Sequence, residues 1–191
     1  MAGPNTICMD PRIKVGLKAL EILEKLERNG RIRADLKDVR AVLKSCQWID
    51  DVIYLKNETE KLKNPIEYAC NPKDEPVVKW CVDTFTGLSR KFKRGEGRSI
   101  LLGLDCALGT IVSCRKLGGG LTVCRVDSTL GRFTIVTNLD VKNGGIHPFV
   151  VLPPRKIGGV LSEAMFVWGA VASMEEVDWK KVEGDVSALL A

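Results

Sequence analysis

The chain has 191 residues, of which 45% are hydrophobic and 28% are charged, a composition typical of a folded globular protein rather than a disordered one. No apolar run approaches the roughly 20 residues that cross a bilayer, and the amino terminus lacks a basic-then-apolar export signal. We therefore expect a cytoplasmic protein with no membrane partner. The net charge is +5, which points to a polyanionic partner.

The first part of the chain has helical periodicity. Asp10 and Pro11 predict a helix start, and apolar residues at helical spacing extend that helix to a stop at Asn29-Gly30. A second helix is predicted over about 35–46, and an apolar patch follows over 48–55. Because three prolines fall within 64–76, we interpret that stretch as a connector. We predict a helical N-terminal region over 1–75 and a second domain over 76–191.

The second domain is predicted to begin with a helix over 77–92 and a basic run that includes Arg90, Lys93, Arg94 and Arg98. The run is either a solvated linker or an arm that contacts phosphates. Residues 76–174 carry 13 Lys and Arg against 6 Asp and Glu, whereas 1–75 carry 14 against 13. The positive excess therefore falls on the second predicted domain.

From residue 99 onward the periodicity shortens to that of strands. Five strands are predicted, over about 103–115, 121–127, 132–138, 147–152 and 164–171. Glycine-rich turns, including Gly118-Gly119-Gly120, separate some of them. Five short strands suit a small β-barrel such as the OB-fold, so the fold class predicted for the whole chain is α+β.

The segment between the last two predicted strands has an unusual composition for a connection. It contains the pair Arg155-Lys156, the pair Gly158-Gly159, Ser162 and Met165. Arginine can donate two parallel hydrogen bonds to a phosphate, and lysine adds a point charge. Glycines allow a ligand to approach the backbone closely. These residue types together indicate a site for a phosphate-rich ligand.

The same segment resembles the signature of the tRNA-binding domain family, approximately N-L-K-P-R-K-x-x-G-x-x-S-x-G-M. The Pro-Arg-Lys core, Gly159, Ser162 and Met165 match in order and spacing, whereas Val151, Pro153 and Ala164 depart from the signature. Residues 104–112, 121–127 and 133–138 resemble the family's first three strands. The resemblance covers about residues 100–172. The family's longer excursion between its third and fourth strands is reduced here to residues 139–146.

The resemblance implies a five-stranded OB-fold, which strand periodicity alone does not distinguish from another small barrel. It implies a protein that binds tRNA by shape and phosphate backbone, commonly as a homodimer, and that can assist an aminoacyl-tRNA synthetase in trans in translation. The expected RNA-binding residues are Arg155, Lys156, Ser162 and Met165, with Arg115, Lys116, Asn138 and Arg125 as secondary candidates. Packing in the core is an equally good interpretation of Met165.

Catalytic motifs are absent from the sequence, so we expect no enzyme, cofactor or metal site. His147 is the only histidine, and the seven cysteines contain no C-x-x-C pair, so a structural role is predicted for both residue types. A protein-interaction or chaperone-like module on the same OB-fold is the alternative function, and a thiol-dependent enzyme is a weaker one. The apolar tail residues either form an interface or close the core: Trp179, Val182, Val186, Leu189 and Leu190.

Overall fold

The computed structural model describes residues 9–64 and 66–190, and they form two compact units. The N-terminal unit extends to Gly103, and the C-terminal unit comprises Leu104–Leu189. The predicted boundary at 75/76 therefore differs from the observed one. The reason is helix α4 (Glu75–Lys91), which packs against the first helix, α1 (Pro11–Arg28), and so belongs to the N-terminal unit.

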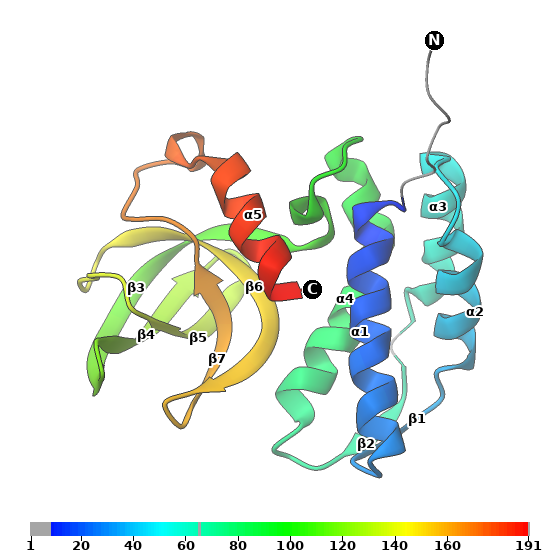
Figure 1. The fold of residues 1–191 in the computed structure, drawn as a ribbon, viewed down its shortest axis with the longest axis horizontal. Coiled ribbons are helices and arrows are strands. Elements are labelled where there is room, and N and C mark those ends of the chain that lie inside the picture. The colour runs from blue at the N-terminus through cyan, green and yellow to red at the C-terminus, as the bar shows by residue number, and fades with distance from the viewer. Residues whose placement is uncertain (1–8, 65, 191) are drawn as a thin grey trace. The chain divides into compact units, whose positions relative to one another are not determined.

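Helices and one small sheet make up the N-terminal unit (Figure 1). Helix α1 begins where it was predicted, because the Asp10 carboxylate accepts a hydrogen bond from the Arg12 amide and Pro11 occupies the first turn. The remaining helical elements are α2 (Lys37–Cys46), α3 (Val52–Thr59), η1 (Glu60–Leu62), α4, η2 (Phe92–Arg94) and η3 (Ile100–Gly103). The predicted connector contains a strand, β2 (Tyr68–Cys70), which pairs with β1 (Ile32–Ala34).

A buried arginine fixes the end of this unit. The side chain of Arg12 is fully buried; its Nη1 donates to the Gly95 carbonyl at 2.7 Å and its Nη2 pairs with Asp10 at 2.7 Å. The Arg12 guanidinium also lies 4.2 Å from the centre of the Phe92 ring. Lys91, buried as well, donates from Nζ to the Gly103 carbonyl at 2.7 Å. These bonds hold residues 91–103 against the helices, because a buried charge is stable only when its donors are satisfied.

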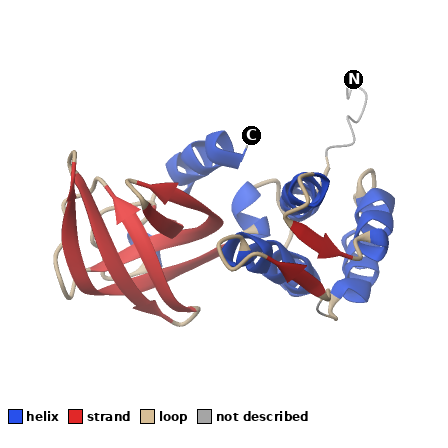
Figure 2. Cartoon of the chain, turned by 90° about the horizontal axis from the view of Figure 1, so that it is seen from below, coloured by secondary structure: helices blue, strands red, loops and turns tan. Residues whose placement is uncertain are grey.

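The C-terminal unit is built on a five-stranded antiparallel sheet in the order β5-β4-β3-β6-β7. Figure 2 shows its strongly curved strands. The strands are β3 (Asp105–Gly118), β4 (Leu121–Ser128), β5 (Gly131–Thr137), β6 (Ile146–Ile157) and β7 (Val160–Phe166). The α+β prediction is confirmed. The predicted fifth strand lies too late in the chain: β7 starts at Val160, and residues 167–171 are not a strand.

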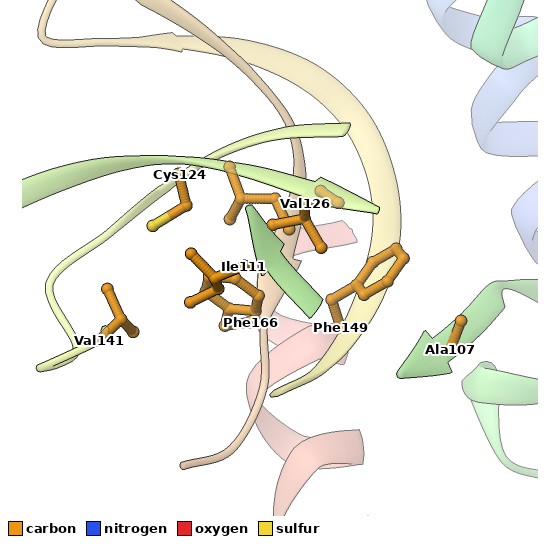
Figure 3. Packing of buried hydrophobic residues seen from close by; sticks show 9 residues of the cluster. Ala107, Ile111, Cys124, Val126, Val141, Phe149 and Phe166 are labelled. Atoms are coloured by element: carbon orange, nitrogen blue, oxygen red, sulfur yellow. The ribbon is translucent and has the colours of Figure 1, made fainter. Parts of the chain in front are cut away.

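One face of this sheet encloses the hydrophobic core. Ile111, Val126, Phe149 and Phe166 come from four different strands, and their side chains gather between the strands in Figure 3. Gly109 on β3 belongs to this face: a Cβ atom there would overlap Val126 and would lie 2.9 Å from Phe149 Cε1. Only glycine therefore allows these side chains to meet above β3.

The predicted OB-fold barrel is not confirmed, because among the described residues no backbone ladder joins the edge strands β5 and β7. The two edges nevertheless lie beside one another. Side chains of β7 accept hydrogen bonds from β5 amides: Ser162 Oγ accepts from the Val136 amide at 3.0 Å, and Glu163 accepts from the Thr134 amide at 2.8 Å. Such bonds satisfy edge amides that would otherwise be unpaired.

The tail forms a helix, α5 (Trp179–Leu190), which follows the short helix η4 (Met174–Glu176). Val182 and Val186 are 1% and 0% exposed. These two side chains are therefore buried within the chain rather than exposed for an interface.

Candidate functional site

The segment that resembles the tRNA-binding signature forms the hairpin of β6 and β7. Its turn is Gly158-Gly159, with φ angles of +57° and +82°, values that glycine adopts without strain in tight two-residue hairpin turns. A Cβ atom on Gly158 would lie 2.6 Å from Leu117 Cδ2, whereas one on Gly159 would meet nothing within 4 Å. The turn geometry and the contact with β3 therefore account for the glycines that the sequence indicated as points of ligand approach.

Two consecutive prolines disturb the pairing of this hairpin. Val151 pairs with Ala164, but the next pair is Arg155 with Ser162, so β6 contains two extra residues between these pairs. Proline cannot donate a backbone hydrogen bond, and prolines in strands are therefore found at bulges and edges. Pro153 and Pro154 occupy this bulge, which sets the direction of the Arg155 side chain.

Arg155 and Lys156 are both exposed but point to opposite faces of the hairpin, because successive strand residues alternate. Arg155 pairs with Ser162 on the face that carries the core, and Lys156 pairs with Leu161 on the other face. The expectation that the basic pair presents its two charges together is therefore wrong.

A groove of about 740 Å³ lies on the Arg155 side of this hairpin. It unites four of the predicted residues, Asn138, Arg155, Ser162 and Met165, with side chains of β5, the 167–169 segment and α5. Most of its wall is apolar and includes Leu121, Val136, Leu139, Leu152, Ile157, Phe166 and Trp168. Concave sites with apolar walls and a few placed polar groups are the usual form of ligand pockets.

Arg155 is held at the rim of the groove by the tail helix. Its Nη2 donates to the backbone carbonyl of Leu189 at 2.8 Å, and the contact is solvent-exposed. The guanidinium has five N–H donors, so this single bond leaves donors for a phosphate or a carboxylate. Across the groove, Lys181 of α5 lies with Nζ 5.5 Å from the centre of the Trp168 ring, a cation–π contact that orients a second positive charge.

Ser162 is placed differently from the expectation. Its side chain is buried, its Oγ accepts from the Val136 amide, and it donates to the Ala164 carbonyl at 3.0 Å. The hydroxyl therefore joins β7 to β5, and we leave Ser162 out of the ligand-contacting set. Met165 is partly buried and Asn138 is exposed at the end of β5, so both remain candidates.

The secondary cationic candidates do not line the groove. Arg115 pairs with Val123 and Arg125 pairs with Ser113 and Thr134, so both arginines lie on the face opposite the core, as Lys156 does. Lys116 pairs with Thr122 on the core face. The structure thus divides the predicted cations between two faces of one sheet.

The distribution of charge also differs from the expectation. The C-terminal unit contains nine Lys and Arg and nine Asp and Glu, so its net charge is zero. The N-terminal unit has 20 Lys and Arg against 15 Asp and Glu, which is the whole excess of +5. The prediction that the positive excess accompanies the signature is wrong, because the basic run at the end of α4 and beyond it belongs to the N-terminal unit and residues 175–189 carry five Asp and Glu against two Lys.

Other reactive side chains are buried in structural settings. His147 is 3% exposed, with its ring 5.1 Å from that of Phe166. Burial raises the pKa of the Cys124 thiol to about 11 and raises the pKa of Cys81 further. Cys8 lies outside the described residues. Within the described ranges no group of three His, Cys, Asp or Glu side chains could hold a metal ion, and no helix combines the length and apolar character needed to cross a membrane.

The comparisons with known proteins found similarity among solved structures alone. No protein-family model and no curated protein matches the chain. Among solved structures, it is similar to the crystal structure of a MetRS-related protein from Pyrococcus horikoshii. The match has 26% sequence identity, covers 39% of this chain and 84% of that chain, and has a TM-score of 0.34. At this TM-score the similarity carries no argument about fold or function.

Sequence reasoning missed the parts of the groove that come from outside the signature. Trp168 was assigned to a strand, and Lys181, Asp185 and Leu189 belong to the tail, yet all four line the groove. The available signal was the helical spacing of Val182 and Val186, which predicts an amphipathic helix with one face against the sheet.

Proposed function

We propose that the chain is a non-catalytic RNA-binding protein that binds tRNA by its shape and phosphate backbone, and that it assists an aminoacyl-tRNA synthetase in trans. We further propose that the five-stranded sheet is an OB-fold whose β5 and β7 edges are joined by the Ser162 and Glu163 side chains. The tRNA assignment comes from the resemblance of residues 100–172 to the tRNA-binding domain family.

The observation that carries the proposal is the position of Arg155. Its guanidinium is exposed at the rim of a groove, its partner among the described residues is a backbone carbonyl rather than a carboxylate, and the bulge at Pro153-Pro154 fixes its direction. A guanidinium in this position can bind a phosphate with two parallel hydrogen bonds. Asn138 adds hydrogen-bonding groups, and the apolar wall with Trp168 offers a stacking surface for an unpaired base.

The test is a mobility-shift titration of the full chain with folded tRNA at several salt concentrations. Arg155→Ala with Lys156→Ala should weaken binding at least tenfold and should reduce the slope of log affinity against log salt by about one, because only one of the two cations lies on the face that binds. The matched control is Lys142→Ala with Lys180→Ala, which removes the same charge from exposed positions of the same unit. Equal affinity of the two double variants would refute the site.

Because Arg155 and Lys156 point to opposite faces, the single variants identify the face that binds. If RNA enters the groove, Arg155→Ala and Asn138→Ala weaken binding and Lys156→Ala does not. If RNA lies on the opposite face, Lys156→Ala weakens binding together with Arg115→Ala and Arg125→Ala.

A protein-interaction module is the second candidate, and one observation favours it. The C-terminal unit has no net charge and its groove is mainly apolar, which suits an apolar peptide segment as well as a nucleotide. On this alternative the full chain fails to shift tRNA at low salt, and Leu139→Asp or Leu152→Asp in the groove wall abolishes the capture of a protein partner.

A further inference from the structure

The excess positive charge of the N-terminal unit is concentrated in one stretch of the chain, residues 76–103. Residues 76–103 contain six Lys and Arg against two Asp and Glu, and Lys91 is the buried member of that set. The remaining cations begin at Lys79 and are concentrated at the end of α4 and beyond it, at Arg90, Lys93, Arg94 and Arg98. This stretch was predicted to be either a linker or a phosphate-contacting arm.

The stretch is not a loose linker, because buried bonds fix its backbone. The Gly95 carbonyl accepts from Arg12 at 2.7 Å, and the Phe92 ring is buried under the Arg12 guanidinium. These contacts turn the backbone of η2 inward while the side chain of Lys93 remains exposed. A cation presented from a fixed backbone loses less conformational entropy on binding than one on a mobile arm.

A second set of cations lies on the neighbouring helix. Helical spacing of three, four and three residues relates four positions along α3 and η1: Ile53, Lys56, Glu60 and Lys63. The backbone angles of Glu60 and Lys63 are also helical. Residues at this spacing share one face of a helix. Lys63 pairs with Glu60 at 2.9 Å, and both side chains are about half exposed, at 52% and 44%.

Element η2 packs against α3, so the fixed stretch and the helix face meet. The pKa of the Glu60 carboxyl is lowered, chiefly by its hydrogen bond with Lys63, and the charges of Lys63, Lys56 and Lys93 lower it further. Lys63 is thus bonded to Glu60 and Lys56 and Lys93 share its surroundings, so three positive charges stand against one carboxylate. Like charges brought close together repel one another, and an additional anion relieves that repulsion.

We propose that Lys56, Lys63 and Lys93 form a phosphate-binding surface through which the N-terminal unit contacts RNA. The inference rests on the proposed RNA-binding function and assigns the electrostatic part of it to a different unit from the one that carries the signature. Ile53 and Tyr54, exposed by 72% and 41% at the start of α3, add apolar and aromatic surface beside these cations. Phosphate contacts of this kind give affinity without sequence preference.

The experiment measures the affinity of the full chain for folded tRNA as a function of salt. The triple variant Lys56→Ala, Lys63→Ala and Lys93→Ala should bind at least tenfold more weakly at low salt, and its slope of log affinity against log salt should fall by about three. The control triple variant is Lys14→Ala, Lys25→Ala and Lys37→Ala. It removes the same charge from exposed positions of the same unit and should leave the slope within about one of the parent's.

A second variant should change the affinity for tRNA in the opposite direction. Glu60→Gln removes the carboxylate from the cluster and should tighten tRNA binding, because all three ammonium groups then face the phosphates. A circular dichroism spectrum and melting temperature equal to those of the parent show that each variant is folded.

The outcomes separate this inference from the proposed function. If the parent chain binds tRNA and depends on Arg155 or Lys156, but the two lysine triples behave alike, the inference is overturned and the proposed function stands. If the parent does not bind tRNA at any salt concentration, the proposed function fails and this inference fails with it. Loss of a captured protein partner in the lysine-cluster triple, with tRNA affinity unchanged, also overturns it.

Discussion

Ser162→Ala distinguishes a structural from an RNA-contacting role for the serine of the signature. Ser162 Oγ accepts from the Val136 amide at 3.0 Å and donates to the Ala164 carbonyl at 3.0 Å, and the side chain is 5% exposed. Alanine would leave a buried amide without an acceptor at the junction of β5 and β7. An unsatisfied buried donor costs about 1–3 kcal/mol, and we expect that loss in the free energy of unfolding of the C-terminal unit.

The assay is urea unfolding followed by tryptophan fluorescence, in a parent where Trp48→Phe and Trp80→Phe leave only the tryptophans of the C-terminal unit. With a urea dependence of about 1–3 kcal/mol per molar, the midpoint should fall by roughly 1 M. The amide of Val136 should also exchange with solvent faster than in the parent. Affinity for tRNA well below the unfolding transition should stay within about twofold.

Thr122→Val is the matched control, because it also removes a hydroxyl from a buried position of the same sheet. Thr122 is 2% exposed, and its Oγ1 has no hydrogen-bond partner in the described part of the chain. Its replacement by the near-isosteric valine should leave the midpoint unchanged or raise it. The reasoning is refuted if Ser162→Ala keeps the parent's midpoint and loses tRNA binding, since the hydroxyl would then act on RNA.

Three further predictions concern packing and thiol chemistry. Gly109→Ala should destabilise the C-terminal unit by about 1–3 kcal/mol or more, because the added Cβ overlaps Val126. Gly184→Ala is the control: a Cβ at this position of α5 would meet nothing within 4 Å, and the substitution should stabilise the unit by about 0.5–1 kcal/mol. A loss of stability in both variants would contradict the packing argument. Val186→Ala should cost about 1.5–3 kcal/mol in urea unfolding, because Val186 is 0% exposed; an unchanged midpoint with altered oligomeric state would instead place it in an interface. Burial raises the pKa of Cys124 to about 11, so its thiolate fraction at pH 8 should be roughly a hundredfold below that of an ordinary cysteine. Mass-spectrometric mapping should therefore show that iodoacetamide alkylates Cys124 slowly. Rapid modification of Cys124 in the native protein would disprove its burial.

The helices were more predictable than the strand edges. Asp10 and Pro11 start α1 as predicted, because capping and proline chemistry act within one turn. The end of β6 was predicted at 152 and the start of β7 at 164, because the residues between them were interpreted as a connection. In the structure β6 continues through a bulge at Pro153-Pro154 to Ile157, and β7 starts at Val160. The pair of β1 and β2 was not predicted, since Ile32 and Cys70 meet only after the intervening helices have folded.

The candidate site was predictable in its residue types but not in its arrangement. The signature identified Arg155, and the structure places it at a groove with Asn138 and Met165. The opposite direction of Lys156 follows from strand alternation, which becomes usable only once the strand is known to extend through Ile157. The buried bonds of Ser162 depend on β5 and β7 coming together, which no local pattern reports.

By itself the sequence determined the fold class, the first helix and the candidate basic hairpin, because propensity, capping and periodicity act over a few residues. Tertiary structure alone decided which unit holds the charge. Helix α4 packs on α1 and takes the basic residues at its end with it, and the acidic residues of 175–189 fall in the same unit as the sheet and cancel its cations. The packing of a segment decides on which unit its charged side chains lie, and that packing depends on contacts between residues far apart in the chain.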